Sequence, residues 1–112
     1  MKPEEIPSWE PFLKRIPLFS TLSAEDLGRI AQRLQPLSLP KGATLFKQGE
    51  ESDALYLIVS GRVRVSKRLS SGGEKDLTAL GPGDCLGEME LLQGGARTAN
   101  ATAESPAELL RL

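Results

Sequence analysis

Two groups of apolar residues in the first third of the chain have helical spacing. One consists of Trp9, Phe12, Leu13 and Ile16, and the other of Leu27, Ile30, Ala31 and Leu34. Both groups follow the pattern i, i+3, i+4, i+7, which is typical of an amphipathic helix with one face on a core. Ser8 and Ser23 are candidate N-caps, and Pro17 and Pro36 are expected to end the two helices.

From residue 37 the hydrophobic period changes to two. Short apolar or alternating segments are separated by glycine-rich and proline-rich turns at nearly regular spacing. The expected strands span residues 37–39, 44–46, 55–60, 62–67, 77–80, 98–103 and 107–112. Such a series predicts a mainly β protein, a jelly-roll-like β-roll with N-terminal helices. We expect residues 1–35 to form the helical segment and residues 36–112 the β-roll, in one compact domain overall.

The composition excludes several classes of function. The 112 residues contain no histidine and a single cysteine, Cys85. The usual general base, histidine-activated nucleophiles and most zinc or iron sites are therefore absent, and so are disulfides within the chain. Cupin-type enzymes, which share the jelly roll, hold their metal through histidines, so we expect no enzyme, metal or cofactor.

Membrane and nucleic-acid partners are also disfavoured. The longest apolar run covers residues 54–59, too short to cross a bilayer, and no secretory signal follows Met1. We therefore expect a cytoplasmic protein. The net charge is −1, and the basic residues of the strand near residue 65 have no interleaved aromatic residues. They are interpreted as a solvated strand face rather than a nucleic-acid site, and no helix-turn-helix is present.

The segment from Gly83 to Ala99 does not follow the alternation of apolar and polar residues that is typical of the strands. Residues 88–92 are good helix formers, enough for about one turn, which Gly94 and Gly95 then end. A one-turn helix presents N–H groups without intrahelical partners, and Arg97 adds a charge-assisted contact to phosphate oxygens. Glu88 is an acceptor suited to a sugar hydroxyl. This arrangement suits a nucleotide with one phosphate, but spacing alone favours a surface ion pair between Glu88 and Arg97.

The ordered glycines and acidic residues resemble the cyclic nucleotide-binding domain family, which includes bacterial cyclic-AMP receptor proteins and kinase regulatory subunits. Gly42 and Gly49 are similar to the family's early turn glycines, and residues 53–65 to its central hairpin. Gly87-Glu88 resembles the start of the phosphate-binding segment, and residues 97–99 its end. The resemblance extends from Phe19 to Leu112.

The resemblance implies a ligand and its binding residues. Glu88 would accept the ribose 2′-hydroxyl, Arg97 would neutralise the cyclic phosphate, and backbone amides near Glu90 and Thr98 would bind phosphate. The expected ligand-binding set is Gly87, Glu88, Met89, Glu90, Arg97, Thr98 and Ala99. Cyclic AMP is favoured over cyclic GMP as the ligand of a sensor domain that regulates an unidentified output domain or effector. The alternative is a protein-interaction or structural module of the same fold without a ligand.

Two features depart from the family pattern. The family usually has a small residue where this chain has Glu90, whose carboxylate would weaken phosphate binding if it faced the site. Family members also continue into a long helix that covers the base. Because this chain ends at Leu112, the resemblance implies a fragment that lacks this covering helix.

Overall fold

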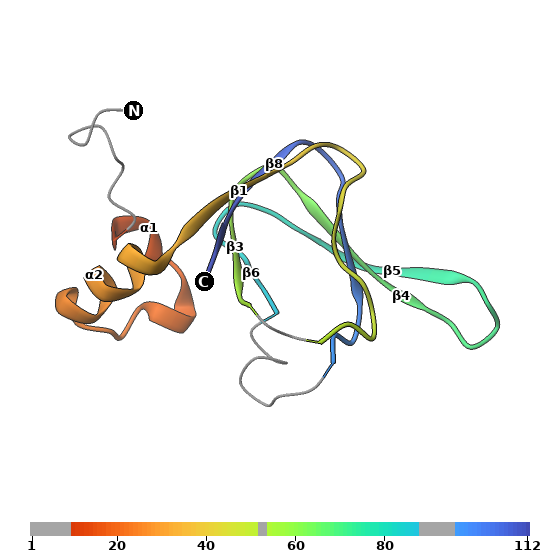
Figure 1. The fold of residues 1–112 in the computed structure, drawn as a ribbon, viewed down its shortest axis with the longest axis horizontal. Coiled ribbons are helices and arrows are strands. Elements are labelled where there is room, and N and C mark those ends of the chain that lie inside the picture. Colours follow the sequence, from red (N-terminus) through yellow and green to blue (C-terminus); the bar gives the residue numbers. More distant parts are fainter. Residues whose placement is uncertain (1–9, 52–53, 88–95) are drawn as a thin grey trace. The chain divides into compact units, whose positions relative to one another are not determined.

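The computed structural model describes residues 10–51, 54–87 and 96–112. Its contacts divide the chain into two units, Met1–Leu34 and Gln35–Leu112, which are described separately. The first unit contains helices and the second contains strands (Figure 1).

The helical unit consists of α1 (Glu10–Lys14), the 3-10 helix η2 (Pro17–Phe19) and α2 (Ala24–Arg33). The predicted cap of α2 is confirmed, because Ser23 Oγ accepts a hydrogen bond from Asp26 N at 3.1 Å. This bond satisfies one of the free N–H groups at the start of the helix. The predicted end of α2 was too late. Leu34 is already extended with ψ 135°, and Pro36 lies inside the strand that follows.

In the described residues, the β unit contains two antiparallel four-stranded sheets. The first has the order β1-β8-β3-β6 and the second the order β2-β7-β4-β5. Their strands are β1 (Gln35–Leu39), β8 (Ala107–Arg111), β3 (Tyr56–Ser60), β6 (Cys85–Leu86), β2 (Thr44–Phe46), β7 (Asn100–Ala103), β4 (Val63–Arg68) and β5 (Glu74–Leu80). This arrangement confirms the predicted mainly β fold. Pro36 is tolerated because β1 lies at an edge of its sheet, where a missing N–H leaves no ladder bond unmade.

The core of the β unit is built from both sheets. Its buried members include Phe46, Tyr56, Ile58, Val63, Leu86, Ala101 and Leu109. Alternate residues of each strand point inward, so side chains from the two sheets meet in one apolar cluster. Tyr56 and Phe46 belong to this cluster but come from different sheets. This pair proves important for the site.

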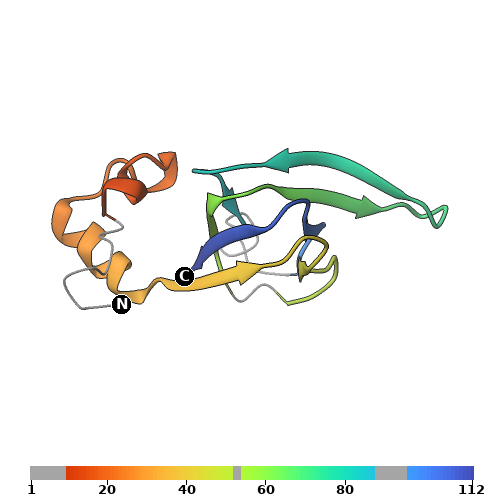
Figure 2. The ribbon, with the colours of Figure 1, turned by 90° about the horizontal axis from the view of Figure 1, so that it is seen from above.

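The hairpin of β4 and β5 extends beyond the rest of the β unit (Figures 1 and 2). Its pairing contains a bulge, because Val65 is opposite Thr78 whereas Ser66 is opposite Asp76. Leu77 is the extra residue and is 51% exposed. The predicted strict alternation therefore fails at Ser66, which is fully buried and donates its hydroxyl hydrogen to Glu74. A bulge changes the local register and redirects the neighbouring side chains.

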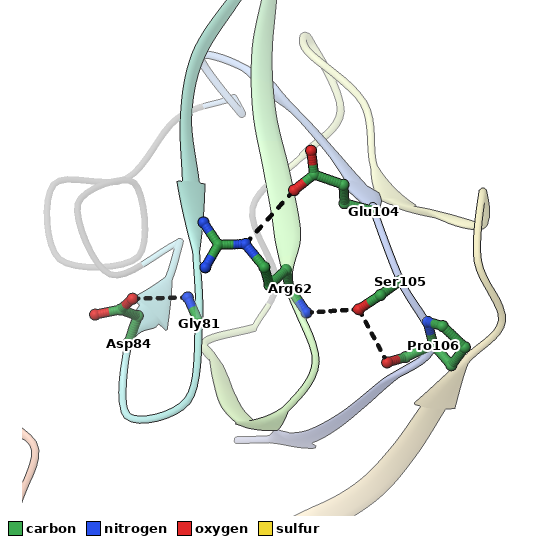
Figure 3. A network of polar contacts seen from close by, with 6 residues as sticks. All are labelled: Arg62, Gly81, Asp84, Glu104, Ser105 and Pro106. Atoms are coloured by element: carbon green, nitrogen blue, oxygen red, sulfur yellow. Dashed lines mark hydrogen bonds and ion pairs between the residues drawn. The ribbon is translucent and has the colours of Figure 1, made fainter.

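The turn after β3 is joined to the end of the β7–β8 connection by polar contacts. Arg62 N donates to Ser105 Oγ at 3.0 Å, and Arg62 Nε lies 3.7 Å from a Glu104 carboxylate oxygen (Figure 3). The same view shows the predicted turn before β6, where Asp84 Oδ2 accepts from Gly81 N at 2.8 Å.

Gly61 is the residue of this turn that tolerates no side chain. Its φ is +85°, and an added Cβ would lie 2.3 Å from the carbonyl oxygen of Pro106. Both the backbone conformation and the space therefore require glycine. Gly72, at the tip of the β4–β5 hairpin, has a similar φ of +97° but nothing within 4 Å of the added Cβ.

Gly61→Ala is expected to lower the free energy of unfolding by about 2–4 kcal/mol, because left-handed strain and a backbone clash add together. Gly72→Ala is the matched control, with a cost of about 1–2 kcal/mol from strain alone. Urea unfolding of both variants measures the difference. Equal losses would mean that the contact with Pro106 does not limit the turn.

Candidate functional site

The structure describes four of the seven predicted ligand-binding residues. Gly87, Arg97, Thr98 and Ala99 are described, whereas Glu88, Met89 and Glu90 lie within 88–95, outside the described residues. The predicted one-turn helix falls in the same segment. Thr98 is exposed, and Ala99 is buried. The site is therefore built from Arg97 and its surroundings.

The side chain of Arg97 points into the β unit. The residue is only 2% exposed, and its Nη2 donates to the carbonyl oxygen of Ala54 at 2.7 Å. Its Nη1 donates to the carbonyl oxygen of Gly87 at 3.4 Å, a longer and weaker bond. Arg97 is therefore not a surface residue, whereas Glu88, the other member of the predicted ion pair, lies outside the described residues.

Two aromatic rings lie against the same guanidinium. Arg97 Cζ is 4.3 Å from the centroid of the Phe46 ring and 5.9 Å from that of Tyr56. The two rings are tilted by 34° with centroids 6.2 Å apart. A guanidinium over an aromatic face is stabilised by about 2 kcal/mol when water is excluded. The rings therefore compensate part of the cost of burying Arg97.

The guanidinium keeps capacity for an anion. An arginine has five N–H donors, and Nε–H of Arg97 has no hydrogen-bond partner. Among the described residues, no carboxylate forms an ion pair with Arg97. Its two hydrogen-bond partners there are neutral carbonyls. A buried cation with an unsatisfied donor is costly unless an anion completes it, so this is a place where an oxyanion would be bound strongly.

The backbone of Arg97 is held as firmly as its side chain. Arg97 N donates to the carbonyl oxygen of Glu50 at 2.7 Å, and Gly49 N donates to the carbonyl oxygen of Arg97 at 2.8 Å. An isolated antiparallel bridge joins Glu51 to Ala96 next to this pair. The loop after β2 thus forms a short ladder with the segment that carries Arg97, and this ladder fixes the position of its Cα.

The absence of a side chain at Gly87 leaves room for the guanidinium of Arg97. Its φ is +86°, as expected for the predicted permissive glycine, and an added Cβ would lie 2.0 Å from Arg97 Nη1. The same Cβ would be 3.2 Å from the carbonyl oxygen of Ala54. In the structure the arginine itself occupies the space.

A pocket of about 410 Å³ reaches this arginine. Its lining residues are Leu45, Phe46, Glu50, Glu51, Tyr56 and Arg97. Sequence reasoning did not assign Phe46, Tyr56 or Ala54 to the site. Their periodicity marks them as core residues, and a backbone carbonyl leaves no signal in the sequence.

Among the described residues, no group of histidine, cysteine or carboxylate side chains could hold a metal ion, and no helix is long and apolar enough to span a membrane.

Comparison with known proteins shows which family this chain matches. The family model described as "Cyclic nucleotide-binding domain" matches residues 36–112, which include the whole described site. A structural neighbour is the regulatory subunit of a cAMP-independent protein kinase A from Trypanosoma brucei. It has a TM-score of 0.87 and 31% identity, over 94% of this chain and 39% of that chain.

Curated relatives show the same likeness in sequence. The cyclic AMP receptor protein of Thermus thermophilus is 41% identical over 100 residues, which cover 89% of this chain and 46% of that protein. The CRP-like cAMP-activated global transcriptional regulator of Mycobacterium tuberculosis is 38% identical, over 80% of this chain and 40% of that protein. The cGMP-dependent protein kinase, isozyme 1, of Drosophila melanogaster is 39% identical, over 85% of this chain and 13% of that protein. The chain spans less than half the length of these relatives.

Gly87→Ala is expected to cost more stability in the wild-type background than in Arg97→Ala. In the wild type the new methyl group must displace the guanidinium, whereas in Arg97→Ala the left-handed strain of about 1–2 kcal/mol and the close approach to the carbonyl oxygen of Ala54 remain. A double-mutant cycle by urea unfolding should give a coupling of about 1 kcal/mol or more. Additive losses would show that the two residues do not share this space.

Proposed function

The chain belongs to the cyclic nucleotide-binding domain family, and from this premise we propose that it is a sensor domain for cyclic AMP. Arg97 binds the cyclic phosphate, and Glu88 accepts the ribose 2′-hydroxyl. Backbone amides near Glu90 and Thr98 complete the phosphate contacts, and Gly87, Met89 and Ala99 belong to the same binding segment. The family membership agrees with the resemblance predicted from the sequence.

The observation that carries this proposal is the burial of Arg97 with an unpartnered Nε–H. A cyclic phosphate has one negative charge and two free oxygens, which suits one guanidinium that presents paired donors in a plane. The neutral carbonyls of Ala54 and Gly87 orient the group without neutralising it. Among the described residues no carboxylate pairs with Arg97, and in this proposal its positive charge acts on the ligand.

The choice of cyclic AMP over cyclic GMP rests on the relatives. Two of the three relatives compared above are named for cyclic AMP and one for cyclic GMP. Those proteins are regulators or a kinase and are more than twice as long as the matched segment. We propose accordingly that nucleotide binding here controls an output domain or effector protein, and that the domain itself performs no catalysis.

A module without a cyclic nucleotide ligand is the alternative, and one finding favours it. The structural neighbour from Trypanosoma brucei is named as part of a cAMP-independent kinase. In addition, Glu90 places a carboxylate where the family usually has a small residue. Isothermal titration calorimetry of the wild-type chain with cyclic AMP and cyclic GMP separates the two functions. No heat of binding with either nucleotide would favour the alternative.

Arg97→Ala is expected to weaken cyclic AMP binding by about 2–5 kcal/mol, because the buried phosphate loses its charge-assisted partner. Arg97→Lys keeps the charge but loses the planar fork, so it should also bind weakly. Arg62→Ala is the matched control, since it removes one positive charge from an exposed side chain. Calorimetry gives the affinities, and thermal unfolding reports whether each variant is folded. Unchanged affinity in a folded Arg97→Ala variant would refute the assignment.

Glu88→Gln is expected to weaken binding of cyclic AMP but to have much less effect on 2′-deoxy cyclic AMP. The deoxy ligand lacks the hydroxyl from which the carboxylate accepts a hydrogen bond, so removal of the carboxylate should change its affinity little. The ratio of the two affinities, measured for wild type and variant in the same buffer, is the readout. An equal loss for both ligands would mean that Glu88 acts elsewhere in the site.

A further inference from the structure

We propose that Phe46 and, more weakly, Tyr56 are positioning residues for the anion, because their rings set the plane in which Arg97 presents its donors. This inference rests on the proposed function, since it concerns the same phosphate contact. The rings are not ligand contacts in this proposal. They act through the guanidinium, whose Cζ lies 4.3 Å from the Phe46 centroid and 5.9 Å from the Tyr56 centroid.

The two carbonyl bonds leave the orientation of the guanidinium incompletely fixed. One is short, from Nη2 to Ala54 at 2.7 Å, but the bond from Nη1 to Gly87 is 3.4 Å long. One strong and one weak bond constrain the position of the group better than they constrain rotation of its plane. An aromatic face held against the cation restricts that rotation, because the attraction to the ring is greatest over its face.

The plane matters because bidentate recognition of an oxyanion is planar. The N–H donors of a guanidinium lie in one plane, and two adjacent donors meet two phosphate oxygens only when the anion lies in that plane. An aromatic ring on one face also keeps solvent from that side. The unpartnered, buried Nε–H of Arg97 lies on the edge of the guanidinium, in the plane of its other donors.

The fold directs Phe46 toward this position. It is the last residue of β2, and the register with β7 shifts between Thr44 and Phe46, from Thr102 to Ala101. Along the strand, exposure falls from the exposed Thr44 through the half-buried Leu45 to Phe46, which is 8% exposed. Irregular pairing of this kind redirects a side chain at the end of a strand. Phe46 therefore belongs both to the apolar core and to the lining of the pocket at Arg97.

The test compares ring removal with matched loss of core volume. Phe46→Leu and Tyr56→Leu keep an apolar side chain but remove the aromatic face. Tyr56→Phe keeps the ring, and Ile58→Val removes one methylene from the same core cluster without a ring contact to Arg97. Calorimetry with cyclic AMP measures affinity, and thermal unfolding measures the stability of each variant.

Phe46→Leu is expected to weaken cyclic AMP binding about three- to tenfold, the effect of ordering one flexible arginine on binding. Tyr56→Leu should lose less affinity, because Tyr56 lies farther from Arg97. Tyr56→Phe, which keeps the ring, should recover the affinity lost in Tyr56→Leu, and Ile58→Val should bind like the wild type. If Phe46→Leu binds like Ile58→Val at equal stability, the positioning role is refuted while the proposed function stands. If the wild-type chain binds neither cyclic AMP nor cyclic GMP, both proposals are refuted together.

Discussion

One buried cation sets the constraints on this site. The guanidinium of Arg97 lies between segments that are far apart in the sequence, and each supplies something that a buried charge needs. Ala54 and Gly87 supply carbonyl oxygens, and Phe46 supplies an aromatic face. None of these groups carries a negative charge. Within the described part of the chain, the buried charge is thus solvated by neutral groups and not by a paired carboxylate.

This requirement explains local features that look unrelated in the sequence. Gly87 has a left-handed backbone, and its missing side chain leaves room for Nη1 of Arg97. The loop containing Gly49 and Glu50 exchanges two backbone hydrogen bonds with Arg97, and these bonds fix the position of the Arg97 Cα. Gly87, the loop after β2 and the irregular end of β2 therefore all contribute to the placement of a single guanidinium.

The sequence was informative where the signal is local. The helix cap at Ser23, the turn glycines and the buried apolar run of β3 depend on a few neighbouring residues, and the structure agrees with them. The burial of Ser66 was not predicted, because it depends on a register shift at Leu77 on the partner strand. Arg97 was predicted as the phosphate ligand from its place in the motif. Its partner Ala54 is 43 residues away and contributes a carbonyl, which any residue has.

The same reasoning links Gly87 to the identity of residue 97. A glycine is needed at residue 87 both for its φ of +86° and because a guanidinium fills the space beside it. Without the arginine, the left-handed φ and the 3.2 Å approach to the carbonyl oxygen of Ala54 would remain. Asparagine and aspartate tolerate the left-handed conformation better than other residues with a side chain. A domain of this fold that no longer binds an anion would be free of the second constraint. The glycine and the arginine are therefore one structural unit, in which the backbone of one residue is shaped to the charge of the other.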